Sequence, residues 1–171
     1  DQYRPLKTAP RKEVAAVAIK MLRFDNKIVS QIDESDYQNI YSDIGPKSIN
    51  ASTQASWVAP VVETALAYGL ISKNRTEFNP DRDVTRAEAY AMIMKTVCLA
   101  PRVNRDLAEP GKTWQQDIHS LAMDAGLTIK SWNDFSPNRP ILRQELFVLA
   151  SRAADWAERT GGCDPKPVYC F

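Results

Sequence analysis

Hydrophobic residues fall at helical spacing in several segments of the chain, and polar, proline-containing loops separate these segments. Residues 57–68 carry their apolar side chains on one stripe, which predicts an amphipathic helix that begins at Trp57. Pro60 lies in its first turn, where proline is tolerated, and Gly69 follows at the usual end position. Residues 87–99 are apolar on nearly all sides, which predicts a buried helix.

This pattern recurs along the chain. A shift of 57 residues, without gaps, places Trp57 on Trp114 and Arg86 on Arg143. Further coincident pairs are Gly69 and Gly126, Phe78 and Phe135, Pro80 and Pro137, Arg82 and Arg139, and Glu88 and Glu145. Each unit therefore consists of a Trp-headed helix, a loop ending in aromatic-x-Pro, and a helix headed by Arg-x-Glu.

A third, partial copy opens the chain, with Arg11 and Glu13 at the arginine and glutamate positions. We therefore expect a single domain. Its parts are a partial repeat over 1–24, a linker over 25–56, complete repeats over 57–99 and 114–158, and a tail over 159–171. The apolar helices of the three copies, 14–22, 87–99 and 146–157, predict an all-α fold around a central three-helix bundle, with long connecting loops.

Thr85-Arg86-Ala87-Glu88 forms a capping box at the start of the buried helix. Thr85 is expected to accept a hydrogen bond from the Glu88 N–H, and Glu88 to accept one from the Thr85 N–H. The first copy has Pro10 at the threonine position and the last has Leu142, so one copy alone keeps the full box.

Composition excludes several functional classes. The 171 residues have a net charge of +1, which argues against binding nucleic acid or an anionic membrane surface. One His and three Cys do not supply the ligands of a Cys₂His₂ or Cys₄ zinc site. No apolar run is long enough to span a membrane. No spacing singles out a catalytic constellation, so we expect no enzyme activity, no cofactor and no metal.

The three cysteines favour an extracellular protein. Cys163 and Cys170 flank a short loop and are expected to form a disulfide, the alternative being two free thiols in a reducing compartment. Cys98 lies within an apolar pattern and is expected to be a buried thiol. The chain begins at Asp1 rather than Met, so we expect a processed or trimmed protein.

The repeat resembles the S-layer homology motif. In the second copy the similar residues are Trp57, Gly69-Leu70-Ile71, Phe78-Asn79-Pro80-Asp81 and Val84-Thr85-Arg86-Ala87-Glu88-Ala89, and Tyr41-Ser42-Asp43-Ile44 resembles the family's lead-in. The resemblance implies a pseudo-threefold helical domain that attaches an extracellular bacterial protein to the cell wall. It also implies a ligand, a secondary wall polysaccharide with ketal-linked pyruvate, bound in grooves between adjacent motifs.

The resemblance makes Arg86, Arg11 and Arg143 the candidate contacts to the ligand carboxylate, and Thr85 is counted with the same box. A first-turn arginine offers a guanidinium beside free backbone N–H groups, which suits an anion. Trp57 and Trp114 are the candidate sugar-stacking residues. The alternatives are solvated or ion-paired arginines and tryptophans that anchor the core.

Two functions remain open at this stage. The first is anchoring to an acidic wall glycan, which the intact box favours. The second is a protein-interaction module that joins subunits of a surface structure without binding glycan. The altered boxes at Pro10 and Leu142 and the missing first Trp-headed helix favour this second function.

Overall fold

The computed structural model describes residues 4–23, 33–44, 57–73, 75–100 and 112–162. The elements in chain order are α1 (Arg11–Arg23), the 3₁₀ helix η1 (Glu34–Asp36), α2 (Val58–Ala67), α3 (Arg86–Thr96), α4 (Trp114–Asp124), α5 (Trp132–Phe135) and α6 (Arg143–Thr160). Within those ranges extended backbone pairs only as isolated bridges. The all-α prediction is therefore confirmed.

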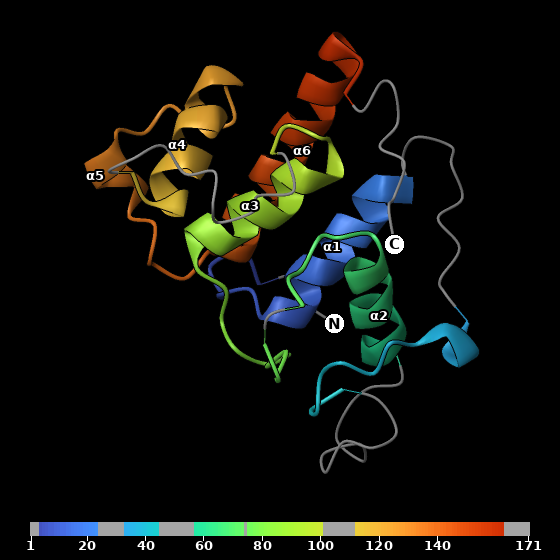
Figure 1. Ribbon diagram of the computed structural model, residues 1–171. Helices are drawn as coiled ribbons and strands as arrows, with labels where there is room; N and C mark the ends of the chain where they lie inside the picture. Colours follow the sequence, from blue (N-terminus) through green and yellow to red (C-terminus); the bar gives the residue numbers. More distant parts are fainter. Residues whose placement is uncertain (1–3, 24–32, 45–56, 74, 101–111, 163–171) are drawn as a thin grey trace.

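Helices α1, α3 and α6 all contact one another. They are the three helices headed by Arg-x-Glu, and their facing side chains are buried. Examples are Val14 and Ala18 on α1, Ile93 and Met94 on α3, and Leu146 and Leu149 on α6. Helix α2 packs on α1 and helix α4 packs on α3, on opposite sides of the central helices (Figure 1).

A closed ring of three backbone hydrogen bonds joins the segments that lead into these helices. The Ala9 N–H donates to the Ile141 carbonyl at 3.0 Å, the Ile141 N–H to the Val84 carbonyl at 2.9 Å, and the Val84 N–H to the Ala9 carbonyl at 3.1 Å. All three residues are buried. Because each copy bonds to the next and the last bonds to the first, the starts of α1, α3 and α6 are fixed relative to one another.

Both Trp-headed helices end as the sequence predicts. Gly69 and Gly126 have positive φ angles of 67° and 73°, which residues other than glycine rarely adopt. After each glycine the chain turns back, because the N–H of Leu70 bonds to the Ala65 carbonyl and that of Leu127 to the Ala122 carbonyl. These bonds satisfy carbonyls that the end of a helix leaves unpaired.

Residues 33–44, called the strap below, are attached to α2 by hydrogen bonds to a buried carboxylate. Glu63 on α2 is 1% exposed, and its two oxygens accept the N–H groups of Gln38 and Asn39 at 2.9 and 3.1 Å. Tyr41, also buried, donates from its hydroxyl to the Ser72 carbonyl at 2.5 Å. The strap thus connects α2 to the loop before α3.

Of the two cysteine predictions, the structure contradicts the one for Cys98 and does not describe the residues of the other. Cys98 is exposed, so its assignment as a buried thiol is wrong. It lies after the end of α3 with a φ of 59°, so the backbone there no longer follows the apolar face of the helix. Cys163 and Cys170 lie outside the described residues, and the described part of the chain gives their predicted disulfide no support. No described helix combines the length and apolarity that crossing a membrane requires.

Candidate functional site

The arginine that heads each central helix lies where one copy meets the next. Arg86 begins α3 and is only 3% exposed. Its guanidinium carbon lies 5.0 Å from the ring centre of Phe135, and its Nη1 donates to Glu145 Oε1 at 3.3 Å. Both partners belong to the following copy, so Arg86 links the second copy to the third.

Glu145 is the carboxylate of this junction. Its Oε1 also accepts from Arg139 at 2.5 Å, and its Oε2 accepts the N–H of Leu142 at 3.0 Å. Burial by itself would raise the pKa of Glu145, but these hydrogen bonds and the charges of Arg86 and Arg139 outweigh burial and lower it. The Arg86 charge is therefore compensated within the protein.

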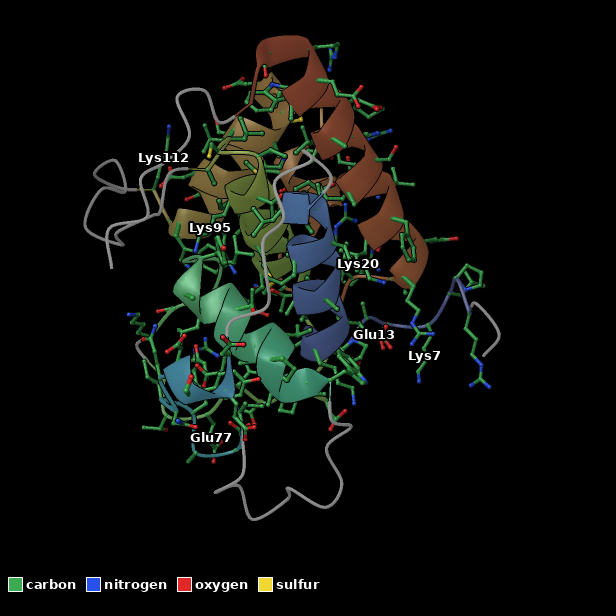
Figure 2. All side chains as sticks on the ribbon, turned by 90° about the vertical axis from the view of Figure 1, so that its right-hand side faces the viewer. Lys7, Glu13, Lys20, Glu77, Lys95 and Lys112 are labelled. Atoms are coloured by element: carbon green, nitrogen blue, oxygen red, sulfur yellow. The ribbon has the colours of Figure 1, made fainter. Side chains whose placement is uncertain are left out.

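Arg143 makes the equivalent link from the third copy to the first. It begins α6 and donates from both Nε and Nη2 to the two oxygens of Glu13, the Nε bond measuring 2.9 Å. Pro10, which precedes α1, has no N–H, so Glu13 cannot accept the backbone hydrogen bond of a capping box. Its carboxylate binds Arg143 instead. Figure 2 shows Glu13 near the start of α1, beside the segment that carries Lys7.

Arg11 differs from the other two. It begins α1, is 8% exposed, and places its guanidinium carbon 4.8 Å from the ring centre of Phe78. Among the residues described, its side chain forms no ion pair and donates no hydrogen bond, and its buried Nε is without a partner. Burial lowers the pKa of Arg11; the Glu88 charge opposes this, and the Arg82 and Arg75 charges add to it.

Glu88, the acid whose charge acts on Arg11, forms its hydrogen bonds with residues of its own copy. Its Oε1 accepts from Arg82 at 2.8 Å and its Oε2 accepts the Thr85 N–H at 3.1 Å. Burial would raise the pKa of Glu88, but the bonds from Arg82 and Thr85 lower it overall. The predicted capping box is confirmed, since Thr85 Oγ1 in turn accepts the Glu88 N–H at 3.3 Å. Thr85 therefore caps α3.

The free N–H groups expected at the helix starts are occupied, which corrects the sequence analysis. The N–H of Arg86 donates to the Arg139 carbonyl at 2.9 Å, and that of Ala87 to the Pro137 carbonyl at 3.0 Å. Equivalent bonds join Arg11 to Arg82, Lys12 to Pro80, Arg143 to Lys7 and Gln144 to Pro5. Neighbouring copies use the donors that were expected to face an anion, so the guanidinium groups remain as the charged donors.

The two tryptophans occupy equivalent positions but differ in exposure. Trp57 is the N-cap residue of α2 and is 40% exposed, so it is not a fully buried core anchor. Trp114 is the first residue of α4 and packs partly buried against the core. In the described ranges no cation–π contact joins either tryptophan to the arginines. Among the described residues, the structure thus brings Arg11 and Arg86 together with phenylalanine rings, and Arg86 and Arg143 together with glutamates.

Sequence reasoning missed the rings beneath the arginines. Phe78 and Phe135 served as landmarks of the repeat, and their role as platforms for Arg11 and Arg86 follows only from the fold. Around Phe135 lie the rings of Tyr90, at 5.0 Å, and His119, at 4.9 Å between ring centres. His119 hydrogen-bonds to the Lys130 carbonyl at 2.8 Å. No trio of His, Cys, Asp or Glu in the described part of the chain is arranged to hold a metal.

A helical repeat module with an arginine at each junction between copies is the class of protein that the fold and these contacts define. Residues 51–89 of the chain match the family model of the S-layer homology domain, which confirms the resemblance seen in the sequence. The matched segment includes the capping box at Thr85 and the arginine that begins α3.

Three curated proteins show more distant similarity. A surface-layer 125 kDa protein of Lysinibacillus sphaericus is 25% identical over 97% of this chain and 13% of its own length. An endoglucanase of Bacillus sp. is 27% identical over 61% of this chain, and an amylopullulanase of Thermoanaerobacterium thermosulfurigenes is 24% identical over 77%. The matched parts cover 11% and 7% of these two enzymes, so the chain spans only a small fraction of each relative.

Proposed function

We propose that this chain is a non-enzymatic module that anchors an extracellular bacterial protein to the cell wall by binding an acidic polysaccharide. The family match and the surface-layer relative support attachment at the cell surface. More specifically, we propose that this polysaccharide is a wall polymer that bears ketal-linked pyruvate. The enzyme-named relatives fit this function if the shared segment is a module attached to their catalytic parts.

One observation carries the proposal: buried arginine side chains stacked on phenylalanine rings where the copies meet. Arg11 and Arg86 are more than nine-tenths buried, and in each the Nε atom has no hydrogen-bond partner. A buried donor without a partner costs free energy, and a ligand acceptor would remove that cost. Guanidinium groups bind carboxylates through charge-assisted, often bidentate hydrogen bonds.

Pyruvate ketal chemistry suits these junctions. The ketal holds a carboxylate rigidly beside an apolar methyl group and a sugar ring, so it presents an anion and an apolar face together. The arginine–phenylalanine pairs offer the matching groups, a cation above a ring. Trp57, 40% exposed at the start of α2, is available to stack on a sugar. Binding of this kind requires no proton transfer.

Co-sedimentation with purified walls tests the proposal. The wild-type chain is mixed with walls that carry pyruvate ketals and with the same walls after mild acid has removed them. We expect the chain to sediment with the first and to stay in solution with the second. Equal sedimentation with both preparations would contradict recognition of the acidic glycan, and failure to sediment with either would contradict wall anchoring.

The alternative, a protein-interaction module, is favoured by a different observation. Phe147 and Val148 on α6 are each 50% exposed, whereas the equivalent residues on α3, Tyr90 and Ala91, are 6% exposed and partly buried. Helix α4 packs on α3, whereas the main helix contacts of α6 are with α1 and α3. Apolar side chains exposed on a helix face are typical of a contact with another subunit.

Val148→Asp distinguishes the alternative from wall anchoring. If the module joins subunits, this variant loses co-purification with its surface-structure partner but leaves sedimentation with walls unchanged. If the module binds glycan alone, the wild-type chain is monomeric in sedimentation velocity and the variant behaves identically. Ser151→Asp, one turn further along α6 at an exposed position, is the matched control for the added charge.

A further inference from the structure

We infer that the three junctions are not equivalent and that the Arg11 junction, formed by Arg11, Phe78, Arg82 and Glu88, holds the carboxylate of the ligand. This inference rests on the proposed function, because the carboxylate is that of the acidic glycan. The inference places the anion at the arginine of the first copy, which has Pro10 at the threonine position of the capping box. The sequence motif alone instead favours Arg86, beside Thr85, as the contact to the anion.

The first reason is the pairing of the arginines. Arg86 has the Glu145 carboxylate at 3.3 Å, and Arg143 is bound by both oxygens of Glu13. Arg11 has no carboxylate within ion-pair distance in the part of the chain that the structure describes. A ligand carboxylate at Arg86 or Arg143 would displace or share an existing partner. At Arg11 it would supply the one that is lacking.

The second reason is that, in the described part of the chain, Glu88 bonds to its own copy and not to Arg11. Both of its oxygens are occupied, Oε1 by Arg82 and Oε2 by the N–H and the hydroxyl of Thr85. In the third copy Leu142 replaces the threonine and has no hydroxyl, and Glu145 Oε1 accepts from both Arg139 and Arg86. Glu145 thus bonds across the junction to Arg86, whereas the bonds of Glu88 among the described residues lie within its own copy.

The third reason is an excess of positive charge. Arg75 and Arg82 both act electrostatically on Arg11, and Glu88 is the acid that opposes them. In the third copy Trp132 occupies the position equivalent to Arg75. The Arg86 junction therefore has an aromatic side chain where the Arg11 junction has a charged one. Three arginines acting with one carboxylate favour an anion more strongly than the two arginines, Arg86 and Arg139, that share Glu145 at the Arg86 junction.

The ring beneath Arg11 is fixed in place. The carboxylate of Asp43 accepts the N–H of Phe78 at 2.8 Å and that of Asn79 at 2.7 Å, and the Phe78 side chain is fully buried. Asp43 belongs to the strap, which Glu63 holds on α2. The shift that relates the copies places Ala100 opposite Asp43, and in the third copy the Phe135 N–H donates to the Ser131 carbonyl at 2.8 Å instead. A preorganised platform lowers the cost of binding a rigid ligand.

Calorimetric titration with a defined small ligand tests the inference. The probe is a methyl hexoside that carries a pyruvate ketal, and its methyl ester is the uncharged comparison. We expect the wild-type chain to bind one equivalent of the acid and not the ester, and Arg11→Gln to weaken binding at least about tenfold. Arg86→Gln is expected to weaken binding less than Arg11→Gln does.

Lys20→Gln is the matched control, because it removes one positive charge from the same helix at an exposed position further along α1 than Glu13 (Figure 2). We expect its affinity to stay within about twofold of wild type, as surface charge effects are weak. A loss for Lys20→Gln equal to that for Arg11→Gln would overturn the inference, since net charge rather than the junction would then govern binding.

A measurement on the wild-type chain avoids any dependence on how the variants fold. Arginine Nε–H signals are recorded in ¹H–¹⁵N correlation spectra during titration with the ketal. The Arg11 signal is expected to shift most, because the Arg11 guanidinium has no carboxylate partner among the described residues, whereas Arg86 is paired with Glu145. A larger shift at Arg86 or Arg143 would contradict the inference while leaving glycan recognition intact. Absence of both probe binding and wall binding would overturn the proposed function as well.

Discussion

The carboxylates of the repeat show how single residues acquire their roles from neighbours. Glu88, Glu145 and Glu13 occupy the same position in three copies, and each accepts from a different set of donors. The residue before each helix decides the set, because threonine offers a hydroxyl and an N–H, leucine an N–H alone, and proline neither.

Stability is therefore expected to fall at acid pH. The pKa values of Glu88 and Glu145 are lowered below the ordinary 4.5, so their contribution is complete above that pH and is lost as pH falls through the lowered values. Urea titrations from about pH 3 to 7 measure this. The double variant Glu88→Gln with Glu145→Gln should show a flatter dependence, and Glu158→Gln, on the exposed end of α6, should match wild type.

The hydroxyl of Thr85 provides a second test at this scale. Thr85→Ala is expected to lower the free energy of unfolding by about 1 kcal/mol, because the Glu88 N–H loses its acceptor. Thr85→Ser keeps the hydroxyl and should recover most of the loss. Equal losses in the two variants, measured by chemical denaturation, would show that the methyl group and not the cap matters.

At the scale of elements, the sequence predicted where helices form but not what holds the strap. Predicted helices over 57–68 and 87–99 correspond to α2 and α3, and Gly69 ends α2 as expected. A pattern of apolar spacing locates a helix because each turn needs only local residues. The bonds from the strap to Glu63 join residues far apart in the chain, and no local pattern indicates them.

Glu63→Ala tests the connection between the strap and α2. The variant leaves the N–H groups of Gln38 and Asn39 without their acceptor, and we expect a loss of about 2–3 kcal/mol in stability. Hydrogen exchange should accelerate most at these two amides. Unchanged exchange there would show that the strap is held by Tyr41 and Asp43 instead.

The turn after α4 gives a prediction that depends on backbone conformation alone. Gly126 has a φ of 73°, and a Cβ added there would meet nothing within 4 Å. Gly126→Ala is therefore expected to cost about 1 kcal/mol from the left-handed backbone, without a steric clash. Gly126→Asn, which tolerates this conformation better, should cost less in the same thermal unfolding measurement.

At the scale of the whole molecule, the closed ring through Ala9, Val84 and Ile141 makes the copies interdependent. Helices α1, α3 and α6 share one core, so no copy has a core of its own. We therefore expect the described part of the chain to unfold as one cooperative unit.

Ile141→Ala tests this interdependence. The side chain is fully buried at the ring, so the variant should lose about 2–5 kcal/mol. Far-ultraviolet circular dichroism and tryptophan fluorescence should report the same lowered midpoint. Ile129→Ala, at a side chain that is 85% exposed, should change stability by less than about 0.5 kcal/mol. Separate midpoints for the two signals would contradict a single unit.

The sequence by itself determined the repeat, the helices, the capping box at Thr85 and the resemblance to the S-layer homology family, because these depend on spacing along one chain. Only the tertiary structure decided which carboxylate meets which arginine. Arg86 reaches Glu145, Arg143 reaches Glu13, and Arg11 remains without a carboxylate among the described residues. Ion pairs between copies require distant segments to come within about 4 Å, a distance that the packing of α1, α3 and α6 sets.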